Sequence, residues 1–191
     1  MFVRKLVLPL FVATLVSLWG ALAFAAEYKV DPGHSFIEFR IKHLGYSWLY
    51  GRFDTISGEF GHDPAKPESS RFSIEVETAS INTNHAERDK HLRSKDFLDV
   101  KKFPKSIFKS MSFTGDAKGG VIEGELILHG VKKKISINVE KVGEGKDPWG
   151  GYRAGFIGKT TLSLKDFGIT YNLGPASKTM EFELGIEGTK K

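Results

Sequence analysis

Apolar and polar residues alternate with a period of two along most of the chain. Ile37, Phe39 and Ile41 share one face of such a segment, while Glu38 and Arg40 share the other. The same alternation recurs around residues 50–60, 72–76, 106–113, 122–128, 135–139, 152–158 and 180–186. This period is typical of strands with one wet and one apolar face. It predicts about eight strands, several of them followed by Gly-, Asp- or Pro-rich turns.

Two architectures satisfy strands of this kind: a sandwich of two sheets, or one sheet closed into a barrel. The chain has no internal repeat, and its connections look short and sequential, which favours an all-β, eight-stranded antiparallel up-and-down barrel. Such a barrel is just wide enough to be filled by side chains or to hold one small ligand. Glycines at inward positions, such as Gly51, Gly58, Gly124 and Gly158, would leave room for an elongated apolar ligand. The alternative, an interior filled by the 15 phenylalanines, stays open.

One charged segment, from Asn84 to Pro104, interrupts the alternation and reads as helix. Asn84 is the expected N-cap, with Glu87 three residues later. Ser94 is expected to cap a second short helical piece. A helix with so little apolar surface cannot build a core of its own, so we expect a short helical cap at one end of the barrel.

The apolar residues of this segment indicate how it would close the barrel. Phe97, Leu98 and Phe103 are expected to enter the mouth as a lid. Arg88 and Asp89 are expected to hold the lid to a neighbouring loop.

The first residues have the pattern of a signal peptide. Arg4 and Lys5 precede an apolar run over residues 6–19, and Ala23-Phe24-Ala25 offers a small-x-small cleavage site. The run is short for a membrane span, and an uncleaved anchor is the alternative. We therefore expect a signal peptide over residues 1–25, a single domain over residues 26–191, and export to the periplasm.

Charge and composition exclude several classes of function. Without Arg4 and Lys5 the net charge is about +3, with both signs interspersed, which does not suggest nucleic acid as a partner. The one block of like charges, Lys132-Lys133-Lys134, reads as an ordinary turn or strand edge. The absence of cysteine excludes disulfides, thiol catalysis and thiolate metal sites.

No catalytic motif is present, so we expect no catalytic residues, no metal and no cofactor. The chain contains neither G-x-S-x-G nor H-E-x-x-H, and its six histidines do not have the spacing of metal ligands. His43 is the one histidine on an apolar face, where it would be a hydrogen-bonded residue of the lumen or a contact to a ligand head group. Trp149 is expected to anchor a loop.

Five blocks of the sequence resemble the YceI family, specifically its periplasmic branch from Gram-negative bacteria. They are HSFIEFRIKHLGYSWLYGRF (34–53), NHAERDKHLRSKDFLDVKKFP (84–104), GELILHGVKKKISINV (124–139), DPWGGYRAGF (147–156) and LKDFGITYNLGPAS (164–177). Lys132 departs from the family's usual GVT near a turn. The resemblance implies a lipocalin-like barrel with a helical cap that binds one polyisoprenoid-type lipid, such as an isoprenoid quinone or its precursor, in a central tunnel.

The candidate ligand-binding residues are those expected on the inward-facing side of the strands, together with Phe97 of the lid. They are Phe39, Ile41, His43, Phe53, Ile74, Val76, Phe97, Leu126, Leu128, Ile137, Phe156, Met180 and Phe182. Two alternatives to a carrier stay open: an enzyme that acts on such a lipid, and a stress-related structural protein with an incidental ligand. Transient contact with a membrane and formation of a homodimer also stay open.

Overall fold

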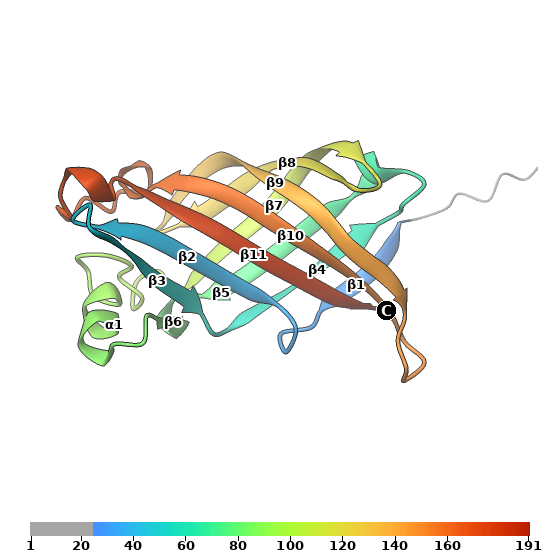
Figure 1. Ribbon diagram of the computed structural model, residues 1–191, viewed down its shortest axis with the longest axis horizontal. Coiled ribbons are helices and arrows are strands. Elements are labelled where there is room, and N and C mark those ends of the chain that lie inside the picture. The colour runs from blue at the N-terminus through green and yellow to red at the C-terminus, as the bar shows by residue number, and fades with distance from the viewer. Residues whose placement is uncertain (1–24) are drawn as a thin grey trace, which may run out of the picture.

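The computed structural model describes residues 25–191, so the expected signal peptide falls almost wholly outside the described residues. Strands form nearly all of the regular structure (Figure 1). They are β1 (Ala26–Val30), β2 (Phe36–His43), β3 (Ser47–Phe53), β4 (Ile56–His62), β5 (Arg71–Glu77), β6 (Ile81–Asn82), β7 (Lys105–Asp116), β8 (Gly119–Leu128), β9 (Val131–Lys146), β10 (Tyr152–Ser163) and β11 (Thr179–Lys190).

These strands close into an eight-stranded antiparallel up-and-down barrel, which confirms the predicted fold class. The ring runs β1-β4-β5-β7-β8-β9-β10-β11 and closes where β11 pairs with β1. β2, β3 and β6 continue three of these strands beyond short breaks in the chain, with β2 paired to β11 and β3 to β2. Every pairing is antiparallel.

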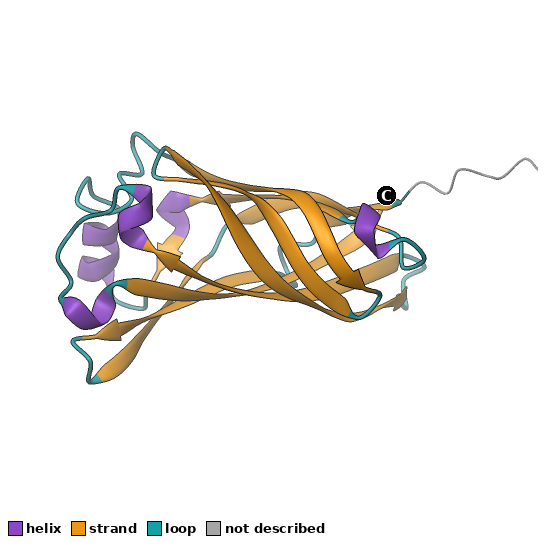
Figure 2. Ribbon diagram, turned by 90° about the horizontal axis from the view of Figure 1, so that it is seen from above, coloured by secondary structure: helices purple, strands orange, loops and turns teal. Residues whose placement is uncertain are grey.

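The two ends of the barrel differ, as Figure 2 shows by gathering most helical turns at one of them. The lid end carries the β2–β3 hairpin, residues 83–104 with helix α1 (Ala86–Leu92), and residues 164–178 with two 3-10 turns, η3 (Leu164–Phe167) and η4 (Pro175–Ser177). The floor end carries the β7–β8 turn, the β9–β10 hairpin and η1 (Pro67–Ser69); η2 (Thr78–Ser80) lies between β5 and β6. No helix among residues 25–191 has the length and apolarity to cross a bilayer.

The lid begins one residue later than the sequence predicts. His85, and not Asn84, is the N-cap of α1: its Nδ1 accepts the backbone N–H of Arg88 at 3.2 Å. Asn84 has φ +59°, in the left-handed region that asparagine tolerates, and this reverses the chain just before the helix.

The predicted second helical piece is also wrong, since residues 94–102 form successive turns. Asp99 has φ +42°, which a continuing right-handed helix excludes. The backbone N–H of Asp99 instead closes a turn on the carbonyl of Ser94.

Three side chains hold the lid to the chain that precedes it. The carboxylate of Asp89, itself buried, accepts both the backbone N–H and the hydroxyl of Thr83. Arg88 donates to the Thr83 hydroxyl and carbonyl, each at 2.7 Å. Arg93 donates to the carbonyls of Ala79 and Ile81. The prediction that Arg88 and Asp89 hold the lid to a neighbouring loop is therefore wrong, since both bond to Thr83 just before the helix, and Arg93 makes the bonds to the preceding segment.

Candidate ligand-binding cavity

An apolar cavity runs from the lid into the barrel as far as Phe72 and Phe156. Its open volume is about 160 Å³, roughly ten times what one water molecule needs. Within the described chain only Ser106 and Thr160 contribute polar side chains to its lining. Both hydroxyls are already engaged, Ser106 with the carbonyl of Ile127 at 2.9 Å and Thr160 with that of Ser136 at 2.8 Å. A cavity without free polar partners does not hold ordered water and suits an apolar guest.

Stacked aromatic rings form the floor of this cavity. Phe60 stacks on Tyr28 at 4.8 Å between ring centroids and on Phe72 at 5.3 Å, and Phe156 meets Phe60 edge-on at 5.5 Å. Phe60 is only 1% exposed and Tyr28 2%. The floor half is therefore filled, and of these rings only Phe72 and Phe156 face the cavity.

The predicted role of the inward glycines is wrong at three of the four positions, and at two of these a phenylalanine takes the space. A Cβ on Gly51 would lie 2.3 Å from the ring of Phe39, and one on Gly124 would lie 2.5 Å from the ring of Phe108. The space that these glycines free is thus taken by neighbouring phenylalanines. Of the four glycines, only Gly158 lines the cavity.

The structure brings most of the predicted residues to the cavity wall. Eleven of the thirteen line it: Phe39, Phe53, Ile74, Val76, Phe97, Leu126, Leu128, Ile137, Phe156, Met180 and Phe182. Ile41 is buried but does not belong to the lining. Whether the lining residues contact a ligand stays a prediction.

The placement of His43 in the lumen is wrong. Its side chain is exposed, because β2 and β3 extend beyond the mouth of the barrel and His43 pairs with Ser47 at the tip of their hairpin. A side chain on the inward-facing side of the strand therefore points into solvent at this position and not into the lumen. The chain reversal at the tip follows from Leu44 and Gly45, both with positive φ.

The candidate set leaves out several strand residues that line the cavity, such as Ile37 and Ile135, and most of the lining from outside the long strands. Ile81, Leu92, Leu164 and Ile169 all line the cavity. Ile81 lies in the two-residue strand β6, Leu92 in α1, and Leu164 and Ile169 in or just after η3, and in such short elements a period of two carries no information. Phe103, expected in the mouth, instead packs against His129 at 4.7 Å and over Gly130.

An aromatic contact closes the mouth between the lid and the loop at residues 164–178. Phe97 lies 4.8 Å from Tyr171, and His91 meets both rings edge-on, at 5.0 and 5.2 Å. His91 is also hydrogen-bonded to Asp96. The lid is thus fastened to the chain by hydrogen bonds at Thr83, Ala79 and Ile81, but to this loop by ring contacts. We expect this side to open first.

A buried histidine lies beneath the floor. His62 is 3% exposed, its Nδ1 is 3.1 Å from the hydroxyl of Ser70, and its ring meets Phe156 edge-on at 5.1 Å. Its Nε2 has no hydrogen-bond partner among residues 25–191, and a carboxylate oxygen of Glu144 is 3.8 Å away. Burial lowers the pKa of His62 in spite of the attraction of Glu144, so the ring is neutral near pH 7 and this contact is not an ion pair.

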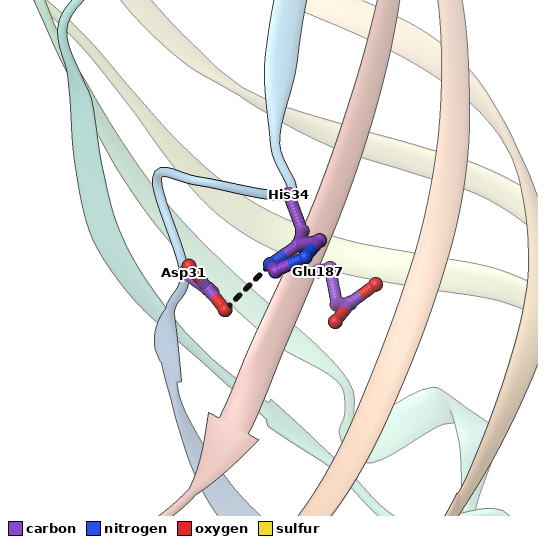
Figure 3. A group of neighbouring side chains, drawn as sticks. All are labelled: Asp31, His34 and Glu187. Atoms are coloured by element: carbon purple, nitrogen blue, oxygen red, sulfur yellow. Dashed lines mark hydrogen bonds and ion pairs between the residues drawn. The ribbon is translucent and has the colours of Figure 1, made fainter. Parts of the chain in front are cut away.

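Asp31, His34 and Glu187 meet at the floor end (Figure 3), where their ligand-type atoms lie within 4.8 Å of one another. A guanidinium already occupies this cluster: Arg153 donates to Asp31 and Glu187, each at 2.7 Å. Hydrogen bonds from Arg153 and His34 hold the pKa of Asp31 down at about 2. The cluster is an ion-pair network that joins β10, β11 and the β1–β2 turn, and a cation there would meet the charge of Arg153.

The same arginine also holds the β9–β10 hairpin, which corrects the role expected of Trp149. Asp147 accepts the backbone N–H groups of Trp149 and Gly151 and the Nε–H of Arg153. The indole of Trp149 is 80% exposed. Asp147 and Arg153 therefore order this loop by hydrogen bonds, and the contribution of Trp149 is limited to a contact of its ring with the Arg153 guanidinium, 5.9 Å from the ring centroid.

Comparison with known proteins agrees with this architecture. The family model described as a YceI-like domain matches residues 28–188. A UPF0312 protein of Ectopseudomonas mendocina is 53% identical over 92% of this chain and 93% of its own. The crystal structure of a YCEI protein of Campylobacter jejuni superposes with a TM-score of 0.71 at 26% identity, over 95% of this chain and 99% of that one.

A third comparison concerns a protein of more distant sequence. The structure of a polyisoprenoid binding domain from Saccharophagus degradans, described as implicated in plant cell wall breakdown, superposes with a TM-score of 0.66. The two chains are 17% identical, over 87% of this chain and 99% of that domain. At this identity the likeness concerns the fold.

Proposed function

Because this chain belongs to the YceI-like domain family, we propose that it binds one long-chain polyisoprenoid-type lipid in its barrel. The observation that carries the proposal is the apolar cavity between the lid and the aromatic floor. The two hydroxyls in its lining, those of Ser106 and Thr160, already donate to backbone carbonyls. The described part of the wall therefore has no free hydroxyl that could bind a polar ligand. The polyisoprenoid binding domain of Saccharophagus degradans, which has the same fold, supports this ligand class.

Burial of methylene groups supplies the affinity in this proposal. Each buried CH₂ contributes about 0.8 kcal/mol, so a prenyl chain needs no specific polar contact along its length. Phe72 and Phe156 mark the deep end of the cavity, and Leu92, Phe97 and Leu98 mark the lid end. The distance between these two ends would then select the chain length.

We further propose that the protein is a periplasmic carrier, with an isoprenoid quinone, a precursor or a similar amphiphile as cargo. The signal-peptide pattern at residues 1–25 supports the location. The binding role is proposed in preference to catalysis because the described residues of the cavity wall include no acid, base or nucleophile beyond the two engaged hydroxyls.

Loading from a membrane is proposed as a transient contact at the lid end. Leu44 and Tyr46, at the tip of the β2–β3 hairpin, are 59% and 89% exposed, and Tyr171 at the mouth is 48% exposed. Exposed apolar and aromatic side chains beside a cavity mouth are suited to a bilayer interface. Formation of a homodimer stays a prediction.

The proposal is tested with the mature protein purified gently from its own cells. Native mass spectrometry should detect one bound prenyl lipid per chain, and delipidated protein should take up a polyprenol of matching length. Leu126→Trp, which fills the cavity, should reduce this uptake at least tenfold.

Ile127→Trp is the matched control, since Ile127 is the next residue of β8 and faces away from the cavity. It should bind like the wild type. An empty barrel that also fails to take up any prenyl lipid would refute the proposal, and so would equal uptake by the two tryptophan variants. Turnover of the bound lipid would favour the enzymatic alternative.

A further inference from the structure

Charge is distributed unevenly between the two ends of the barrel. Four segments lie at the lid end, which is opposite to the C-terminus in Figure 1: residues 40–50 at the tip of the β2–β3 hairpin, 83–104, 129–134 at the β8–β9 turn, and 164–178. These segments hold 13 lysine and arginine residues against five aspartate and glutamate residues, whereas the rest of the described chain holds 13 against 18. The lid end therefore carries a net charge of +8, and the remainder carries −5.

Few of these positive charges are neutralised by neighbouring acids. Nine exposed lysines of the lid end form no ion pair with any residue from 25 to 191: Lys42, Lys90, Lys95, Lys101, Lys102, Lys133, Lys134, Lys165 and Lys178. Two of the five acids there are already bonded, Asp89 to Thr83 and Asp96 to His91. The other three are Glu87, Asp99 and Asp166. An excess of free positive charge on one surface attracts an anionic partner.

Two of these lysines are exposed because the barrel wall is interrupted at the seam between β9 and β10. The two strands pair from their hairpin as far as Lys159 opposite Asn138, and there the pairing ends. Lys133 pairs with Leu126 of β8, so its side chain leaves the sheet on the same face as that cavity-lining residue. A closed wall would bury the ammonium at a high free-energy cost. Because β10 does not cover β9 here, Lys133 and Lys134 are exposed and line a groove outside the seam.

The outer face of the β2–β3 hairpin borders the same groove and combines aromatic with basic side chains. Trp48 and Tyr50 alternate along β3 and share a face. Arg40 and Lys42 lie on that face too, since they pair with Tyr50 and Trp48. The centre of the indole ring is 4.4 Å from the guanidinium carbon of Arg40 and 4.3 Å from the ammonium of Lys42. Arg40 and Tyr50 line the groove together with the two seam lysines.

We propose that the lid end docks on an anionic phospholipid leaflet, with the tip of the β2–β3 hairpin at the level of the head groups and the free lysines close to the lipid phosphates. The inference rests on the proposed function and names the chemistry of the membrane surface at which the cavity is loaded. Tryptophan and tyrosine side chains settle at the membrane–water interface, and each lysine near an anionic surface strengthens binding.

The hairpin tip favours a bilayer over a soluble acidic protein as the partner. Leu44 and Tyr46 are largely exposed there, and a bilayer interface takes up such side chains without a preformed complementary pocket. The uneven charge would also turn the mouth of the cavity toward an anionic surface before contact is made.

The test titrates delipidated protein of residues 26–191 with vesicles of phosphatidylcholine, either pure or with about 30% phosphatidylglycerol. The protein should bind the anionic vesicles about tenfold more tightly at low salt, and this preference should shrink as salt screens the lysines. The double variant Lys133→Gln, Lys134→Gln should lose about tenfold in affinity for the anionic vesicles.

A second double variant, Lys118→Gln with Lys146→Gln, is the matched control. It removes two exposed lysines of the floor end that form no ion pair within residues 25–191. It should bind both kinds of vesicle like the wild type.

The orientation is read from Trp48 and Trp149, the two tryptophans of residues 26–191, which lie at opposite ends of the barrel. In the variant Trp149→Phe, the remaining Trp48 should shift its fluorescence to shorter wavelength on anionic vesicles and be quenched by brominated lipid. In the variant Trp48→Phe, the remaining Trp149 should show neither change.

Equal affinity for neutral and anionic vesicles would overturn the proposal, as would equal losses in the two double variants or a response of Trp149 as large as that of Trp48. Binding to polyglutamate as tight as to anionic vesicles, with no shift of Trp48, would overturn it in favour of an acidic protein partner. Uptake of a polyprenol from detergent is measured in parallel. Protein that takes up the polyprenol but does not bind anionic vesicles would refute the docking alone, whereas protein that docks without taking up the lipid would refute only the proposed function.

Discussion

The two halves of this barrel are built from the same strands but are packed in opposite ways. In the floor half, Tyr28, Phe60 and Phe72 stack on one another and Phe156 meets them edge-on, so aromatic rings fill most of the interior. In the lid half, the inward positions are mostly aliphatic, and the two strands of one seam separate. The difference teaches that one eight-stranded barrel can contain a packed core at one end and a ligand cavity at the other. The packed end then supplies the folding stability that the hollow end lacks.

The largest expected effect separates the halves by stability. Phe60→Ala should lower the free energy of unfolding by about 3–5 kcal/mol, because it leaves a cavity among three contacting rings. Leu128→Ala, in the wall of the lid-half cavity, should cost about 2 kcal/mol, since Leu128 already borders open space. Chemical denaturation of both delipidated variants measures this. Equal losses would contradict the view that only the floor half is a packed core.

The next effect concerns the rate at which ligand leaves. Tyr171→Ala removes the ring that joins the loop to Phe97 and His91. An aromatic contact contributes about 0.5–1.5 kcal/mol, so release of a fluorescent prenyl analogue should accelerate between about two- and tenfold. Trp149→Ala, an exposed aromatic at the floor end, is the control and should leave the rate unchanged. Equal acceleration by both variants would rule out the lid end as the exit.

The smallest effect is a dependence of stability on pH at the floor end. Burial lowers the pKa of His62 below its usual value near 6.5, so the unfolded chain binds a proton there before the folded chain does. Stability should therefore fall as the pH drops below about 6.5, by at most about 1.4 kcal/mol per pH unit for this one proton. Lys141, Glu144 and Asp63 also act on this group.

The measurement is the difference between the unfolding free energies at pH 7 and pH 5.5. His62→Gln should reduce that difference relative to the wild type, whatever its own stability. A variant with the same pH dependence as the wild type would show that His62 does not carry this effect.

Much of this architecture follows from sequence alone, because a period of two fixes which residues of a strand share a face. That argument places Phe39, Ile137 and Phe182 on the cavity wall. It fails where the strand leaves the barrel, as at His43, and where the chain has no period, as at Ile169. It also cannot tell that the rings of Phe39 and Phe108 cover Gly51 and Gly124, because that depends on side-chain packing between strands.

The seam between β9 and β10 marks a second limit of the sequence. Lys132-Lys133-Lys134 reads as a solvated charge run, and only the register shows that Lys133 lies on the face of Leu126. Likewise, the sequence suggests that Trp149 orders the β9–β10 hairpin, whereas Asp147 and Arg153 make the bonds. Contacts between residues far apart in the chain decide both cases.

The most direct test of a hollow lid half above a filled floor is a high-resolution structure of the protein with a bound polyprenyl chain. We expect continuous density for the prenyl tail inside the barrel, beginning under Phe97 and ending against Phe156, with Tyr28 and Phe60 unmoved. A chain bound on the outer surface, or one that reaches the floor end only by displacing the stacked rings, would contradict the account.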